Sequence, residues 1–248
     1  MTIRLPHPVL RRPSAAEFAL GALAVAVAFV IFPVAGTASR LAIVVGVAVS
    51  WALAVFAARR RPALVAALVV PVLAGAVFLC LPGRSLARAP LRDAYVRALA
   101  RYGRAPYVWG GERLWGIDCS GLARMALVDA LVERGLAEAD PGALRTAADL
   151  WWHDASAAEL GQGYGGRTLL LSIPSSVNAA DARPGDLAVS GNGMHVVICT
   201  AKGAWIEADP RFRGVRTVAT PSADGYYPYP ARIVRWKALT DPAVSPMR

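Results

Sequence analysis

The chain is poor in cysteine and histidine, the residues that build disulfide frameworks and most zinc sites. It has three of each among 248 residues: Cys80, Cys119, Cys199, His7, His153 and His195. An odd number of cysteines without framework spacing argues against a disulfide scaffold. No two of these six residues stand at zinc-ligand spacing, which disfavours a structural metal. We therefore expect neither a metal nor another cofactor.

Lysine is also scarce, and so are acidic residues in the first third of the chain. Only Lys202 and Lys237 are lysines among 27 basic residues, and Glu17 is the single acid before Arg84. The net charge of +10 is scattered, with no basic-aromatic stripe and no nucleic-acid-binding motif. We therefore expect no nucleic-acid partner, in spite of an isoelectric point near 10.2.

What the first third does contain is three long apolar runs with arginines only at their ends. We expect membrane-spanning helices at about residues 16–38, 41–58 and 63–82, because crossing about 30 Å of hydrocarbon takes roughly 20 apolar residues. Three such runs in succession disfavour both a soluble helical core and a cleaved signal peptide. Apart from the thiol of Cys80 the runs lack ionisable groups, which favours an anchor over a transport path. Pro71 predicts a kink.

The arginines around these runs predict their orientation. Three arginines precede the first run and three more, at residues 59–61, separate the second from the third, whereas Arg40 alone separates the first from the second. Short arginine-rich loops stay in the cytoplasm. This rule places the N-terminus and the second loop inside and everything after Pro82 outside. The arginines that open the following domain argue mildly against this, but long domains translocate largely regardless of charge.

The pattern after Arg84 predicts an α+β domain in which helices pack on an antiparallel sheet. Helices are expected at residues 90–102, 119–134 and 142–153, with Gly135 closing the second. Strands are expected at 168–172, 186–190, 195–200, 204–209, 215–219 and 232–238. The expected division is a membrane anchor at 1–84, this domain at 85–240 and a tail at 241–248.

Cys119 is the cysteine whose position suggests chemistry, because it lies where a loop enters a helix. A thiol at a helix N-terminus meets unpaired N–H groups and the positive end of the helix dipole, which favour the nucleophilic thiolate. The competing interpretation is an ordinary buried cysteine, the commoner fate of this residue. Cys80 and Cys199 are expected to be passive apolar residues.

The surroundings of Cys119 resemble the NlpC-type cell-wall peptidases, a papain-like family of bacterial cysteine hydrolases. Four motifs stand in the order of that family: PYVWGG at 106–111, DCSGL at 118–122, RPGDL at 183–187 and HVVI at 195–198. With the segments between them they cover most of the chain from about residue 91 to 236. The resemblance implies a papain-like α+β cysteine peptidase domain, here after an all-α segment of three transmembrane helices.

The resemblance also implies roles for individual residues. Cys119 would attack a peptide carbonyl, and His195 would take the thiol proton and later protonate the leaving amine. Tyr107 would help the Cys119 backbone N–H to hold the developing negative charge. Asp118 and Ser120 would line the substrate groove, although Asp118 could simply cap the helix.

Further aromatic residues are candidates for the groove walls. Trp109 and Trp152 are the substrate-binding candidates, with packing in a loop or in the core as the alternative reading for each. Trp152 lies in a stretch, residues 147–182, that is longer than the link that this family usually has. Trp151 and Tyr164, in the same stretch, could likewise line the groove or cover the core. His153 is expected at the surface.

The third catalytic position departs from the commonest pattern of the family, which has a histidine or another polar residue twelve positions after the base. Here that position is Glu207, whose carboxylate can accept an imidazole N–H and stabilise the imidazolium. A short turn between the two strands would bring His195 and Glu207 together in a hairpin. Asp209 shares the same strand face and is the alternative orienting residue.

The sequence thus predicts a membrane-anchored, extracytoplasmic cysteine peptidase acting on peptidoglycan peptides. By family resemblance, the bond would be a D-glutamyl to diamino-acid linkage. One alternative keeps the nucleophile but acts as an N-acetylmuramoyl-L-alanine amidase or as an amide or lipid acyltransferase. Another is a catalytically silent cell-wall-binding or scaffold module. The expected partners are peptidoglycan peptides and the lipid bilayer. The sequence identifies no protein partner.

Overall fold

The computed structural model describes residues 14–84 and 86–240 and divides into two compact units. One unit comprises Met1–Ile31 and Ala38–Gly75, and the other comprises Phe32–Thr37 and Ala76–Arg248. Phe32–Thr37 therefore belongs with the C-terminal domain, although its neighbours in sequence do not. The expected tail at 241–248 and the arginines before residue 14 lie outside the described residues.

The N-terminal part forms three helices, α1 (Ala15–Ile31), α2 (Thr37–Ala58) and α3 (Pro62–Cys80). Of these, α2 and α3 are long and apolar enough to cross a membrane, with mean hydropathies of 2.5 and 2.7. The first helix is shorter than the expected 16–38 and has 17 residues. It ends there because Pro33 follows closely and disfavours helical backbone at the residue before it. At 1.5 Å per residue its length is about 25 Å.

Small residues allow α1 and α2 to approach closely within the first unit. A Cβ added at Gly46 would lie 3.0 Å from both the Ala22 carbonyl oxygen and the Ala26 Cβ. Close contact through small residues is typical of helices that associate in lipid. On α3, the Leu68 carbonyl accepts a hydrogen bond from the Trp51 indole at 3.1 Å. Pro71 lies inside α3, as the sequence indicated.

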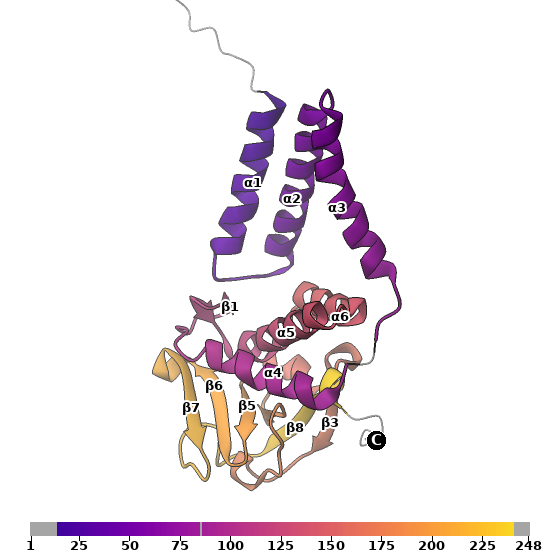
Figure 1. The fold of residues 1–248 in the computed structure, drawn as a ribbon. Coiled ribbons are helices and arrows are strands. Elements are labelled where there is room, and N and C mark those ends of the chain that lie inside the picture. The colour runs from indigo at the N-terminus through magenta and orange to yellow at the C-terminus, as the bar shows by residue number, and fades with distance from the viewer. Residues whose placement is uncertain (1–13, 85, 241–248) are drawn as a thin grey trace, which may run out of the picture. The chain divides into compact units, whose positions relative to one another are not determined.

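The C-terminal unit is an α+β domain, which confirms the expected fold class. Its six-stranded antiparallel sheet has the order β3-β8-β4-β5-β6-β7, and the labelled strands can be followed in Figure 1. The strands are β3 (Thr168–Ser172), β4 (Leu187–Ser190), β5 (Val196–Ala201), β6 (Ala204–Asp209), β7 (Gly214–Ala219) and β8 (Ala231–Trp236). A separate small hairpin pairs β1 (Glu112–Arg113) with β2 (Gly116–Ile117).

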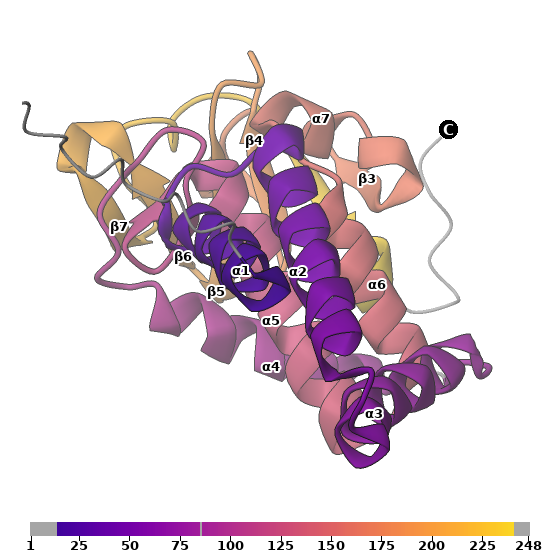
Figure 2. The same ribbon diagram turned by 90° about the horizontal axis from the view of Figure 1, so that it is seen from above.

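Helices cover one face of this sheet, as Figure 2 shows from above. They are α4 (Arg88–Arg101), α5 (Cys119–Ala137), α6 (Pro141–Trp152) and the short α7 (Ala157–Gly161). Single 3₁₀ turns occur at Tyr164–Gly166, Val177–Ala179, Pro210–Phe212 and Lys237–Leu239. The core forms around α5, most of whose side chains are buried. A helix that is apolar nearly all round thus lies at the centre of the domain.

The expected end of α5 at Gly135 is wrong, because the helix continues to Ala137. Gly135 is instead a contact point with α6. A Cβ added there would lie 2.8 Å from Leu144 Cδ2 and 3.2 Å from Ala143 Cβ. The glycine therefore permits two helices to pack closely and does not terminate one.

Candidate active site

The loop before α5 is fixed by the carboxylate of Asp118, the N-cap residue. Its Oδ1 accepts hydrogen bonds from the backbone N–H of Gly121 at 2.6 Å and from the hydroxyl of Ser120 at 3.0 Å. Its Oδ2 accepts the backbone N–H of Gly110 at 2.8 Å. Burial, the largest influence, raises the pKa of Asp118, and these hydrogen bonds act in the opposite direction. Asp118 therefore caps the helix and holds the 106–111 motif against it.

Cys119 is the first residue of α5 and is 8% exposed. Burial raises the pKa of its thiol to about 12, and the negative charge of Asp118 acts in the same direction. Backbone N–H groups of Val196, Ser120 and Cys119 itself lower the pKa by a smaller amount. Burial thus favours the neutral thiol, against the backbone dipoles at the helix N-terminus, which favour the expected thiolate.

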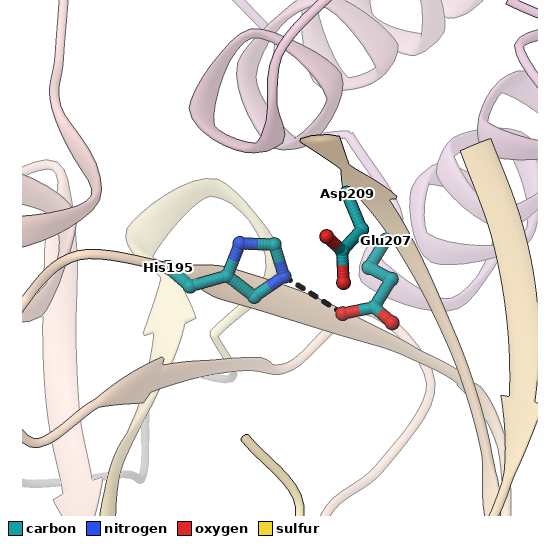
Figure 3. Close-up of side chains that lie close together, drawn as sticks. All are labelled: His195, Glu207 and Asp209. Carbon is teal, nitrogen blue, oxygen red and sulfur yellow. Dashed lines mark hydrogen bonds and ion pairs between the residues drawn. The ribbon is translucent and has the colours of Figure 1, made fainter. Parts of the chain in front are cut away.

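The contribution of the Val196 N–H also locates the sulfur, because Val196 follows His195 and opens β5. His195 is 2% exposed, and its backbone N–H donates to Ser190 Oγ at 3.0 Å. Its Nε2 lies 2.7 Å from Glu207 Oε2, on the neighbouring strand β6, as the dashed line in Figure 3 shows. Across residues 14–84 and 86–240, no hydrogen-bond partner of His195 Nδ1 is found. That nitrogen remains available to exchange a proton.

Glu207 is held by Arg216, a residue that the sequence reading missed. The two residues face each other directly in the β6–β7 register. Arg216 Nε donates to Glu207 Oε1 at 2.8 Å, and its Nη1 lies 2.7 Å from Asp224. Glu207 is fully buried, so this guanidinium balances a carboxylate that would otherwise be costly to desolvate.

The alternative orienting residue, Asp209, has a different partner. Its carboxylate accepts hydrogen bonds from the Arg211 side chain and backbone, and the geometry gives the imidazole hydrogen bond to Glu207. Ligand atoms of His195, Glu207 and Asp209 lie within 4.8 Å of one another, a spacing that could suit a metal ion. Arg216 and Arg211 already supply positive charge to the two carboxylates, so the arrangement is electrostatically satisfied by the protein.

Tyr226 covers the face of His195 and was also missed from the sequence. The two rings stack with centroids 4.4 Å apart and planes inclined by 20°. The Arg211 guanidinium lies 5.3 Å from the centroid of the same tyrosine ring. Tyr226 comes from the segment between β7 and β8, where no motif marked it. Only the folded chain brings it to His195.

Cys119 and His195 open into one groove of about 630 Å³. Of the expected site residues, the groove is also lined by Tyr107, Trp109, Asp118 and Ser120. Trp109 is 80% exposed. Burial raises the pKa of Tyr107, with the nearby Cys119 as a second cause, so its hydroxyl stays protonated and can donate a hydrogen bond.

Trp152 does not line this groove, so the structure does not support its expected role in substrate binding. It is 37% exposed at the end of α6, with its ring centroid 6.2 Å from that of Trp151, which packs against the core. Instead, the long link contributes Asp154, Ala155, Ser156, Ala157 and Glu159 to the groove wall. His153 is exposed and paired with Asp149, as expected of a surface residue.

A second buried ion pair is formed by residues that line the groove. Arg124 on α5 pairs with Glu112 on β1 and, at 3.0 Å, with Asp154. The side chains of Arg124 and Glu112 are 1% and 3% exposed. Through these contacts the nucleophile helix is tied both to the β1–β2 hairpin and to the segment after α6.

A model of the NlpC/P60 family matches residues 103–233, just over half of the chain. The chain belongs to the NlpC/P60 family. Its members are typically cysteine peptidoglycan hydrolases. The matched range contains Cys119, His195, Glu207, Tyr107 and Tyr226, so this NlpC/P60 domain includes the whole groove constellation described above.

Several solved structures are similar to the NlpC/P60 domain. The NlpC/p60 domain of the peptidoglycan hydrolase SagA shares 22% identity over 60% of this chain and 98% of that one, with a TM-score of 0.34. The peptidoglycan hydrolase RipB from Mycobacterium tuberculosis shares 24% identity over 63% and 74%, with a TM-score of 0.38. NlpC2 from Trichomonas vaginalis shares 19% identity over 64% and 50%, with a TM-score of 0.40. Among curated protein sequences no match is found.

Proposed function

We propose that this protein is a membrane-anchored cysteine peptidase that hydrolyses amide bonds in peptidoglycan stem peptides through Cys119, His195 and Glu207. The observation that carries the proposal is that Cys119 and His195 line one groove, while Glu207 Oε2 lies 2.7 Å from Nε2 of the His195 imidazole. This leaves Nδ1 free for proton transfer with the thiol. Membership of a family of peptidoglycan hydrolases supplies the class of substrate.

The burial of the Cys119 thiol suggests the order of events. Because burial favours the protonated thiol, His195 removes the proton as the sulfur attacks the peptide carbonyl. The imidazolium that forms is stabilised by Glu207, which Arg216 holds in place. His195 then protonates the leaving amine, and water hydrolyses the thioester with His195 again acting as base.

Two donors are available for the carbonyl oxygen as it becomes negatively charged. The Cys119 backbone N–H lies at the N-terminus of α5, where such groups have no partner within the helix. The Tyr107 hydroxyl lines the same groove and stays protonated. Together they would form the oxyanion site.

The proposed topology has three membrane crossings, a cytoplasmic N-terminus and an extracytoplasmic catalytic domain at residues 85–240. The lengths and hydropathy of α2 and α3 support two crossings, and α1 lies near the lower length limit for a third. Three crossings would put the α1–α2 loop and the chain after α3 on the same side. The membership of Phe32–Thr37 in the compact unit of the catalytic domain agrees with this.

The test is digestion of purified muropeptides by the full chain, with product masses as the readout. We expect cleavage within the stem, at a D-glutamyl to diamino-acid bond, and its loss by at least about a thousandfold in Cys119→Ala. Cys199→Ala is the matched control, because Cys199 is buried in another part of the core and should leave the rate unchanged. Release of intact stem peptides would identify an amidase instead, and full activity of Cys119→Ala would refute the cysteine mechanism.

A further inference from the structure

Large apolar side chains gather at the tip of the β1–β2 hairpin and on the loop before it. Leu114 and Trp115 form the turn between the two strands and are 52% and 50% exposed, and Trp109 is 80% exposed. Single exposed apolar residues are common, but three within seven positions of one short loop and hairpin mark an interaction surface. Two of the three are tryptophans, whose apolar ring and polar N–H suit a boundary between water and an apolar phase.

This hairpin is paired with the loop that links the first two apolar helices. Val34 forms an antiparallel bridge with Gly111. The Ala35 N–H donates to the Gly110 carbonyl at 3.0 Å, and the Glu112 N–H donates to the Pro33 carbonyl at 3.0 Å. All of these residues belong to the same compact unit. The two segments therefore form one surface within the catalytic domain.

Side-chain packing tightens this pairing. A Cβ added at Gly116 on β2 would lie 2.7 Å from Pro33 Cβ, and one at Gly110 would lie 3.3 Å from Val34 Cγ1. The glycines thus let the loop lie directly against the hairpin. The exposed side of the loop is itself apolar, because Phe32 is 58% exposed and Val34 is 37% exposed.

The chain on either side of this loop indicates what covers the surface. Ile31 is the last residue of α1, and Thr37 is the first of α2. If these helices cross the membrane, a loop of so few residues must lie at the bilayer surface, and the hairpin paired with it lies there too. Tryptophan is enriched in that interfacial layer.

We propose that the surface formed by Phe32, Trp109, Leu114 and Trp115 inserts into the headgroup region of the outer leaflet. Trp109 also lines the catalytic groove, so one rim of the groove opens at the bilayer surface. The inference rests on the proposed membrane anchor and deepens it. The anchor fixes where the groove opens, and the preferred substrates are stem peptides presented next to the membrane, such as those on a lipid-attached carrier.

Insertion depth provides the direct test. The full chain, with Cys80, Cys119 and Cys199 replaced by alanine, receives a nitroxide label at Leu114→Cys in nanodiscs of phosphatidylethanolamine and phosphatidylglycerol. We expect the label to collide more with dissolved oxygen than with an aqueous nickel chelate. A label at Lys202→Cys, in the exposed turn at the far end of β5 from His195, should show the reverse. Equal exposure of both labels to the nickel chelate would overturn the proposal.

Activity supplies a second measurement that does not depend on the label. The double variant Leu114→Ser and Trp115→Ser should cleave a soluble muropeptide at the unchanged rate. Its cleavage of a muropeptide tethered to a phospholipid in nanodiscs should fall at least about tenfold, because two apolar side chains that would insert into the headgroup region are lost. The matched control replaces Ile173 and Tyr229 by serine, since they are similarly exposed but lie next to β3 and β8 and outside the β1–β2 hairpin. Equal rates for both double variants on the tethered substrate would contradict the proposal.

The two levels of the proposal fail in different ways. If the unaltered chain does not remain with the nanodiscs, the membrane anchor itself is refuted. If it remains and cleaves soluble muropeptides, but the label at position 114 is aqueous, only the insertion of the hairpin is refuted.

Discussion

The helices α3 and α5 have the same length, 19 residues, and both are rich in apolar side chains. Yet none of the residues of α3 is buried, whereas most of α5 is covered by the domain. The apolar surface of α5 is removed from water by the domain, whereas the described chain leaves that of α3 exposed. The comparison teaches that hydrophobicity identifies apolar helices, but only their burial shows which solvent they need.

The two helices also differ in the polar groups they hold. The described part of α3 has no charged side chain. In contrast, α5 buries Arg124 and begins with the Cys119 thiol, because the surrounding chain supplies partners for each. Lipid supplies no polar partners, so a helix that faces lipid can hold a charged side chain only against a neighbouring helix.

The largest expected effect concerns Cys119, the buried thiol at the start of α5, and is measured by the pH dependence of its alkylation. The pKa of the Cys119 thiol is raised from 9.0 to about 12. At pH 8 this lowers the fraction of thiolate about a thousandfold. Iodoacetamide should therefore modify Cys119 slowly in a Cys80→Ala and Cys199→Ala background, with a rate rising about tenfold per pH unit. A rate that is already maximal near neutral pH would instead reveal a preformed thiolate–imidazolium pair.

Removing the buried charge of α5 should have the next largest effect. In Arg124→Met, Glu112 and Asp154 lose the guanidinium that faces them, which should cost about 3–5 kcal/mol of unfolding free energy. Chemical denaturation of the full chain, followed by near-ultraviolet circular dichroism, measures this loss. The control is Arg134→Met on the same helix, whose partly exposed pair with Glu138 should contribute less than about 1 kcal/mol. Equal losses in the two variants would contradict the assigned role of burial.

A charge placed on α3 should have a slightly smaller effect, on membrane insertion and not on the unfolding free energy of the domain. Leu73 is 58% exposed near the middle of the helix, and Leu73→Arg should disfavour membrane insertion by about 3 kcal/mol. The measurement is the fraction of chain that resists alkaline extraction from membranes, with Leu73→Ala as the control. Since α3 contributes nothing to the domain core, the unfolding of the catalytic domain should not change. Destabilisation of that domain with normal insertion would mean that α3 is a soluble core helix.

Several elements could be predicted from the sequence because their signals are local. The strand β6 matches its expected range of 204–209, and α5 begins at Cys119 as expected. Glu207 was marked by the spacing of the resembled family, and the expected hairpin brought it near His195, but strand alternation left Asp209 as an alternative. The structure gives the imidazole hydrogen bond to Glu207. Counting across the next turn in the same way would also have placed Arg216 opposite Glu207. The end of α5 was missed because a buried glycine, with its weak local preference, was taken for a stop signal.

The sequence by itself determined the α+β class, the apolar N-terminal helices and the order of the cysteine, histidine and carboxylate motifs. These features depend on periodicity and on residues close in sequence. Only the tertiary structure decided that Tyr226 covers His195, that Trp152 does not line the groove and that the α1–α2 loop pairs with the β1–β2 hairpin. It also decided that burial raises the pKa of the Cys119 thiol, because desolvation depends on which distant segments close over the sulfur.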